Sequence, residues 1–205
     1  MSTTVCADDR DLYEDLPSCR GQKSLPGTRN HMFMIRKANI TTWPEWPDSE
    51  AALLEDVAKL KGDFVLGADK QWVKIDLVPN QNNIASERVG TYGAYLFKNT
   101  YTAVVPGSEE KQTALASEMI NDDVIFLVPQ RNGKYRLIGN NMFNTDVSPA
   151  LATGSTTEDT NAITFTITCE DTIPAPFYTG KILTTDGEIN GATGDLVPDA
   201  DPPGE

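Results

Sequence analysis

Residues 84–105 limit the choice of fold more than any other part of this 205-residue chain, because they combine two extended segments with a glycine-rich turn at 90–93. From residue 94 to 105 the side chains alternate between a largely apolar and a mostly polar phase. The first phase holds Tyr95, Phe97, Tyr101, Ala103 and Val105, and the second holds Leu96, Lys98, Thr100, Thr102 and Val104. This alternation predicts a strand with one packed face and one wetter face.

The predicted strand is unusually long. Its 12 residues compare with about 5–6 in an ordinary strand. A strand of this length usually extends beyond its own domain or runs along a barrel. Asn99 interrupts the apolar phase, so we expect a bulge or an interface at that position. Residues 84–89 precede the turn and are predicted to be extended as well.

The rest of the chain is also rich in strand signals. Further strands are predicted at 31–36, 63–66, 71–78, 123–129, 134–139, 161–169 and 177–183. In 71–78 one face is fully apolar, and Asn132-Gly133 marks a hairpin. Helices are predicted from Asp48 or Ser49 to about Lys61, and from a Ser108 cap to about Asn121. Residues 144–160 are predicted to be a loop. The sum is a mainly β fold, an antiparallel β-sandwich or partly open barrel with a flanking α-helix.

Acidic residues are concentrated toward the two ends of the chain. The net charge is −13; residues 1–20 hold five acidic and two basic side chains, and 154–205 hold ten acidic and one basic. Residues 1–30 and 184–205 are predicted to be extended arms flanking a domain at 31–183. The middle of the chain is therefore almost neutral, which argues against tight phosphate binding by clustered lysine and arginine.

The sequence offers no recognisable catalytic, cofactor or metal site. His31 is the single histidine, and we interpret it as structural. Cys6 and Cys19 have no close-spaced partner pair, whereas Cys169 ends an apolar strand face and is expected to be buried. Three such cysteines fit synthesis in a reducing cytoplasm. No secretion signal or membrane-length apolar run is visible.

Two other function classes stay open on the residues alone. Trp43, Trp46 and Trp72 could form a sugar-binding platform, although tryptophans beside prolines more often pin a loop onto a sheet. The carboxylate pairs available to an enzyme lie at predicted element ends, where acids usually act as caps or solvated charge. They are Asp8-Asp9, Glu109-Glu110, Asp122-Asp123 and Glu170-Asp171. Three basic residues on the 123–139 hairpin, Arg131, Lys134 and Arg136, are too few for a nucleic-acid site.

An ordered series of short segments resembles a known family. The segments are 34–40 followed by Trp43-Pro44, then 62–66, 72–76, 97–101 running to Pro106-Gly107, and 164–166 leading to 174–180. In this order and spacing they resemble the tail tube (major tail) proteins of tailed bacteriophages, especially forms found in phages and prophages of Bacteroidetes. The resemblance spans roughly residues 31–183. The stretch 49–61 and the two long arms look like additions to that pattern.

The resemblance implies a structural virion protein and no enzyme. Subunits of such proteins form rings, commonly hexameric, that stack into a tube through which double-stranded DNA leaves the capsid. It implies that Lys98, Thr100 and Thr102 face the lumen, and that a long hairpin contacts neighbouring subunits and the adjacent ring through Glu87, Arg88, Thr91, Tyr92 and Asn99. Implied partners are further copies of the chain, tape-measure, terminator or baseplate proteins and a sheath. Alternatives are a tail terminator, a connector, a contractile-injection tube subunit or a carbohydrate-binding β-sandwich.

Overall fold

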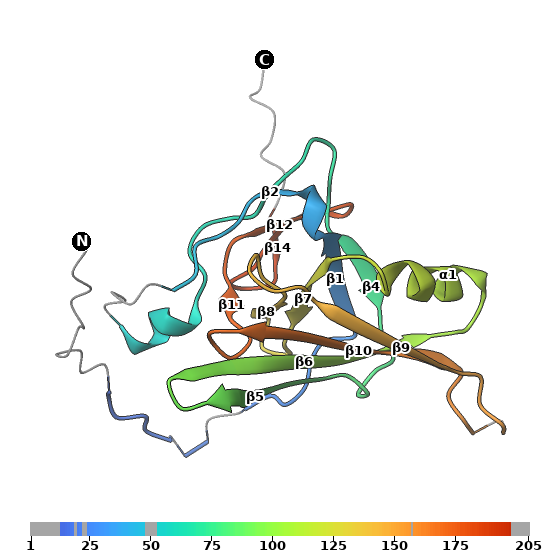
Figure 1. Ribbon diagram of the computed structural model, residues 1–205, viewed down its shortest axis with the longest axis horizontal. Helices are drawn as coiled ribbons and strands as arrows, with labels where there is room; N and C mark the ends of the chain where they lie inside the picture. Colours follow the sequence, from blue (N-terminus) through green and yellow to red (C-terminus); the bar gives the residue numbers. More distant parts are fainter. Residues whose placement is uncertain (1–12, 19, 22–23, 48–52, 157, 198–205) are drawn as a thin grey trace.

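The computed structural model describes residues 13–18, 20–21, 24–47, 53–156 and 158–197. Within these ranges the chain forms two large antiparallel sheets, a small three-stranded sheet, a two-stranded ribbon and one α-helix (Figure 1). The prediction of a mainly β, antiparallel, sandwich-like fold with a flanking helix is confirmed. Neither large sheet closes into a barrel by itself.

A five-stranded sheet forms the middle layer of the molecule. Its strands lie in the order β11-β8-β7-β1-β4, and every neighbouring pair is antiparallel. Their bounds are Phe177–Tyr178, Tyr135–Ile138, Val124–Pro129, His31–Arg36 and Val73–Asp76, respectively. All six residues of β7 are buried. A central strand with apolar residues at successive positions is covered on both faces, so this sheet has packed material on each side.

A four-stranded sheet covers one face of the middle layer. Its order is β5-β6-β10-β9, with bounds Asn83–Thr91, Ala94–Pro106, Ala162–Asp171 and Asp146–Ala152. The core between the two sheets includes Met32, Tyr101, Phe126 and Phe165, all 0% exposed. The helix α1, Glu110–Met119, packs Met119 into the same core and lies beside the sheets in Figure 1.

The opposite face of the middle layer is covered by short elements. They are β2 (Ile40–Thr42) paired with β3 (Val65–Leu66), the sheet of β12 (Lys181–Thr184), β13 (Gly187–Asn190) and β14 (Leu196–Val197), and the 3-10 helices η1 (Lys37–Asn39) and η2 (Leu54–Ala58). A second core lies beneath them, centred on Phe64, Trp72 and Tyr178. The Phe64 ring is 5.4 Å from the Trp72 ring and 5.0 Å from the Tyr178 ring, measured between centroids.

Both helix predictions need correction. Residues 48–52 lie outside the described residues, and from 53 to 61 the chain forms only the 3-10 helix η2. The chain is extended after η2 because Lys59 bridges to Phe177 and Lys61 bridges to Glu45. The second helix begins later than expected: Glu109 occupies the N-cap position, without a side-chain capping bond, and Ser108 does not cap the helix.

Two strand assignments also differ from expectation. Residues 146–152 form β9 instead of a loop, although Pro149 lies in the middle of the strand. Proline is tolerated on edge strands, and β9 is at the edge of its sheet. In 71–78 the expected apolar face is not uniform, since Val73 is 53% exposed while Trp72, on the opposite phase, is 1% exposed. Trp72 is buried because a second core covers that face.

The two terminal segments behave differently. Residues 187–197 are not an arm, because β13 pairs with β12 and β14 pairs with β13. Residues 198–205 lie outside the described residues, as do Cys6 and Cys19. On the N-terminal side, residues 13–18 are exposed and form no strand, and Thr28 joins the domain through a bridge to Gln130. Among the described helices, none is long and apolar enough to span a bilayer.

Candidate assembly surface

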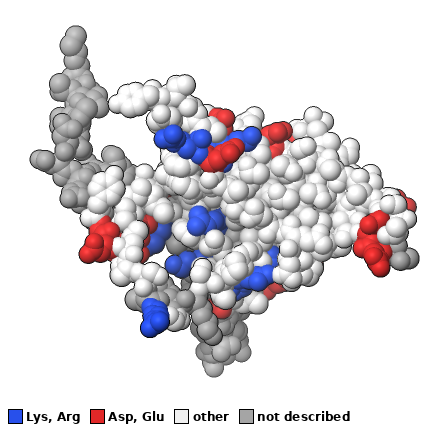
Figure 2. Space-filling model, turned by 90° about the horizontal axis from the view of Figure 1, so that it is seen from below, with Lys and Arg blue, Asp and Glu red and all other residues white. Residues whose placement is uncertain are grey.

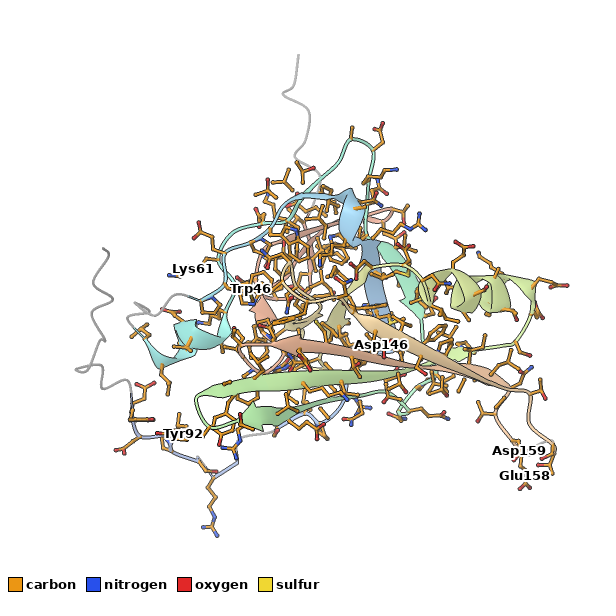
Figure 3. The ribbon with its side chains drawn as sticks, in the orientation of Figure 1. Trp46, Lys61, Tyr92, Asp146, Glu158 and Asp159 are labelled. Carbon is orange, nitrogen blue, oxygen red and sulfur yellow. The ribbon has the colours of Figure 1, made fainter. Side chains whose placement is uncertain are left out.

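The β5–β6 hairpin projects beyond the sheet to which it belongs. β6 pairs with β10 only as far as Phe97, opposite Asp171. Beyond that point β5 and β6 pair only with each other, ending at Thr91 opposite Ala94. Tyr92 at the tip is 94% exposed and extends to one side in Figure 3. A tip that leaves its own core in this way is available for contact with another molecule.

The hairpin keeps its shape through local contacts. The guanidinium of Arg88 lies 4.3 Å from the centroid of the Tyr95 ring, a cation–π distance. Gly90 has φ of +94°, and a Cβ atom there would collide with the carbonyl oxygen of Ala94. Of the residues assigned to this hairpin from the sequence, Glu87, Arg88, Thr91 and Tyr92 are exposed.

Asn99 differs from the other hairpin residues. Its position shows no bulge, because it pairs with Ser86 on one side and Cys169 on the other without a break in register. It is 2% exposed. Its side chain accepts hydrogen bonds from Ser86 Oγ (2.6 Å) and the Ala175 backbone N–H (2.8 Å), and donates to the Ile173 carbonyl (3.2 Å). The expected bulge is therefore absent: Asn99 breaks the apolar pattern because its side chain satisfies backbone groups inside the domain.

The polar phase of β6 faces away from the core, as the alternation predicts. Lys98, Thr100 and Thr102 are partly exposed, whereas Tyr101 and Ala103 of the alternate phase are 0% exposed. The structure adds a second row of hydroxyl groups from β10. Thr102 pairs with Thr166, Thr100 with Thr168, Val104 with Thr164 and Lys98 with Glu170. Paired residues of antiparallel strands share a face, so these side chains form one surface, here called the threonine face.

Sequence reasoning found both rows separately but did not join them. The alternation of 161–169 identified its threonines as solvent-facing, but registry with β6 depends on pairing between strands about 60 residues apart. The threonine face carries few charges: Lys98, with Glu87 and Glu170 as its cross-strand neighbours and Asp146 on β9. Figure 2 shows the side of the molecule seen from below, where charged groups are scattered and form no continuous basic patch.

Both edges of the four-stranded sheet are open in the described chain. β5 has nine residues and β9 has seven, and each pairs with one neighbour only. An unpaired edge presents backbone N–H and C=O groups that can pair with another strand. Pro149 removes one donor from β9, but β5 contains no proline. The sheet can therefore accept strands from other chains at one or both edges.

Among the described residues, the tryptophans and His31 are held in packing contacts, and Asp8-Asp9 lies outside the described residues. Trp72 is buried, and Trp46 donates from Nε1 to Asp171 Oδ1 at 3.1 Å, so these rings serve the packing of the domain. Trp43 packs on Phe64. His31 contacts the Phe33 ring edge-on, and burial lowers the pKa of its imidazole. Within the described ranges, no group of three or more His, Cys, Asp or Glu side chains is arranged to hold a metal ion.

Several of the remaining charged candidates have local partners. Asp122 and Asp123 form ion pairs with Arg36 and Lys37, respectively. Arg136 stacks over the Phe177 ring and donates to the Ala175 carbonyl at 2.7 Å. Arg131 binds the side chain of Asn80. The basic residues of the β7–β8 hairpin are thus divided among different contacts, which leaves the open-edged sheet as the main candidate surface.

Comparison of the chain with protein-family models, curated proteins and solved structures finds no match in any of the three.

Proposed function

We propose that this protein is a subunit of a bacteriophage tail tube, which assembles into stacked, hexameric rings and forms the channel for DNA ejection. The observation that carries the proposal is the four-stranded sheet: it has two open edges, one polar face and a hairpin that projects past its core. The resemblance of residues 31–183 to tail tube proteins agrees with this arrangement. In this role the protein is a component of the virion that is synthesised in the host cytoplasm.

The open edges suggest how a ring closes. Adding the β9 edge of one copy to the β5 edge of the next extends the sheet, and repetition around an axis joins the sheets into a barrel. A closed barrel leaves no free edge, which removes the aggregation risk of exposed strands. The long β5 edge is then an assembly element.

The threonine face suits the inner wall of such a barrel. Double-stranded DNA is held by clustered lysine and arginine, and its affinity rises with the number of phosphate contacts. A wall of hydroxyl groups with Lys98 flanked by Glu87 and Glu170 gives DNA few points of attachment. Thr100 and Thr102 are thus proposed to line the lumen together with Thr166 and Thr168.

The hairpin tip is proposed to contact the adjacent ring. Tyr92 and its neighbour Thr91 have no covering residues within the described chain. Tape-measure proteins are proposed partners of the lumen, terminator and baseplate proteins are proposed partners of the tube ends, and sheath proteins are proposed partners of the outer surface.

Electron microscopy of the concentrated, purified protein tests this function directly. Rings or tubes with a central channel are the expected result, and a protein that stays monomeric under all assembly conditions contradicts the proposal. Neighbouring residues of a strand point their N–H groups to opposite edges, so Glu87→Pro and Arg88→Pro form a matched pair. The variant with the lower thermal stability is the one that has lost a hydrogen-bond donor to β6. The variant with the higher thermal stability has lost a donor at the open edge, and it should fail to close rings although the subunit stays folded.

A tail terminator or connector would show rings that do not stack, whereas a contractile-injection tube subunit would form the same tubes. A monomer that binds glycans would instead favour a carbohydrate-binding module.

A further inference from the structure

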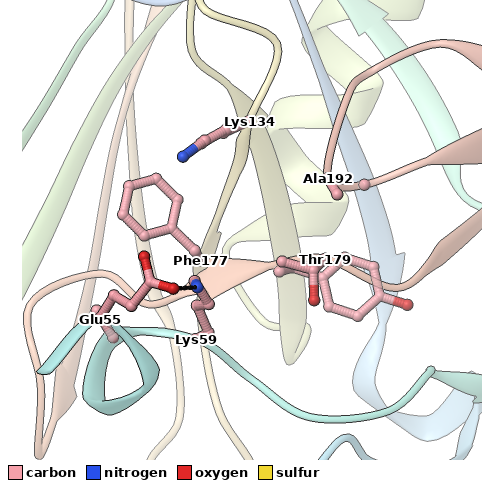
Figure 4. A pocket seen from close by; sticks show the side chains of 9 residues that line it. Glu55, Lys59, Lys134, Phe177, Thr179 and Ala192 are labelled. Carbon is pink, nitrogen blue, oxygen red and sulfur yellow. Dashed lines mark ion pairs between the residues drawn. The ribbon is translucent and has the colours of Figure 1, made fainter. Parts of the chain in front are cut away.

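A cavity of about 380 Å³ lies far from the threonine face, between η2, the β7–β8 hairpin, β11 and the loop after β13 (Figure 4). Its apolar lining comes from Ala58, Phe177, Tyr178 and Ala192, and the side chains of Lys59 and Lys134 reach its rim. Because it opens to solvent and is lined by rings and methyl groups, it suits an apolar side chain of another segment.

The positive charge at this cavity is only partly compensated. Lys59 Nζ is 2.8 Å from Glu55 Oε1 and 3.6 Å from Asp56 Oδ1. Lys134 Nζ lies 5.8 Å from the centroid of the Phe177 ring and has no carboxylate within ion-pair distance among the described residues. Arg136 lies over the same ring at 4.0 Å. An occupant with an apolar side chain next to a carboxylate would match both properties.

The N-terminal arm of the chain has this composition. Residues 13–18 read Tyr-Glu-Asp-Leu-Pro-Ser, so Leu16 follows two acidic residues. The side chain of Leu16 is 81% exposed. None of residues 13–18 lines the cavity of its own chain, and in Figure 1 this segment runs at the opposite side of the β5–β6 hairpin from β11.

The arm is long enough to reach a neighbouring molecule. It leaves the domain at Thr28, which bridges to Gln130. Thr28 is ten positions after Ser18, and ten steps of extended chain span up to about 35 Å. We propose that Leu16 from the arm of a second copy inserts into this cavity, with Glu14 and Asp15 facing Lys134. This inference depends on the proposed function in one respect: both require that a second copy of the chain lies next to the first.

Disulfide trapping between two variants tests the proposal. Both carry Cys6→Ser and Cys19→Ser; one also carries Leu16→Cys and the other Ala192→Cys. Mixing them under mild oxidation should give a covalent heterodimer. The control mixture pairs Leu16→Cys with Lys70→Cys, an exposed lysine outside the cavity, and should give none. No heterodimer above the control level overturns the proposal. A single chain with both cysteines that forms only an internal disulfide also overturns it, because the arm would then dock in its own chain.

A charge exchange separates docking from chance collision. Lys134→Glu in the Ala192→Cys chain should lower the initial crosslinking rate about fivefold, the effect of one modest ion pair. Glu14→Lys and Asp15→Lys in the partner should restore it. Equal rates in all combinations contradict the assigned pairing. If the heterodimer forms but electron microscopy shows no tubes, the tail tube function is rejected and the docking of Leu16 is retained. If tubes form but no heterodimer is trapped, the docking of Leu16 is rejected and the tail tube function is retained.

Discussion

The side-chain oxygen of Asn99 accepts a hydrogen bond from the backbone N–H of Ala175 at 2.8 Å, and neither residue is appreciably exposed. Asn99 is on β6, and Ala175 belongs to the Pro174-Ala175-Pro176 segment that leads into β11. The bond therefore connects the four-stranded sheet to the start of an edge strand of the middle sheet. A buried amide that satisfies the backbone in this way specifies how two layers meet.

Replacing Asn99 with alanine should destabilise the protein by about 2–3 kcal/mol, because the buried N–H of Ala175 and carbonyl of Ile173 lose their partner. Ser86→Ala removes only the donor to Asn99 and should cost about 0.5–1 kcal/mol. Urea unfolding followed by tryptophan fluorescence measures both free energies. Equal costs for the two variants would show that Asn99 has no special role at this junction.

The sequence predicted best where a local pattern decides the structure. Residues 161–169 alternate cleanly and form β10, and Asn132-Gly133 lies in the turn between β7 and β8. The long strand after residue 94 was also found, because its alternation persists for 12 residues. Such patterns express which face of a strand is buried, and a sequence carries that information directly.

The failures occur where distant contacts override local preference. Strand β9 contains a proline and follows a polar stretch, and it forms because the long β10 offers an edge for pairing. Lys59 and Lys61 fit a helix by pattern, but bridges to Phe177 and Glu45 hold them extended. The threonine face was missed as a unit for the same reason, since the register of Thr100 with Thr168 is a tertiary contact.

Gly90→Ala should disorder the end of the hairpin, while Gly93→Ala should not. Both glycines have positive φ, +94° and +85°, so either alanine adds about 1 kcal/mol of backbone strain. Only at Gly90 would the new Cβ also meet the carbonyl oxygen of Ala94; around Gly93 the space is open. Amide hydrogen exchange provides the measurement: protection of the Val89–Leu96 pair should be lost in the first variant only. Similar protection in both variants would argue against this steric reason.

Cys169 should be unreactive in the folded protein. It is 3% exposed, and burial raises the pKa of its thiol from 9.0 to about 11. In a Cys6→Ser, Cys19→Ser background, a thiol reagent at pH 8 should label no cysteine before urea is added and one afterwards. Rapid labelling without denaturant would mean that this part of the core opens readily.

The raised pKa of the Cys169 thiol also predicts that the protein loses stability at alkaline pH. The folded pKa lies above the unfolded value, so the folded state keeps a proton that the unfolded state releases. Stability is therefore unaffected well below pH 9 and falls as the pH rises from about 9 to 11. Burial raises the pKa of the Tyr101 and Tyr178 phenols as well, which continues the decline at higher pH. Thermal unfolding of wild type and Cys169→Ala across this range isolates the thiol: the wild type should lose more stability between pH 9 and 11.

Adding positive charge to the threonine face should make assembled tubes retain DNA. Thr100→Lys with Thr166→Lys places two lysines near Lys98, on adjacent strands of one surface. Both positions are outside the core, so folding stability should change by less than about 0.5 kcal/mol each. The control, Thr42→Lys with Thr193→Lys, adds the same charge at exposed positions on other elements.

The variants are assembled with labelled double-stranded DNA and then treated with nuclease. Lysines on a lumen wall should hold protected DNA that high salt releases, because phosphate contacts weaken as ionic strength rises. Lysines on the outer surface should hold only DNA that the nuclease digests. If both variants leave the DNA equally digested, the threonine face does not line the channel.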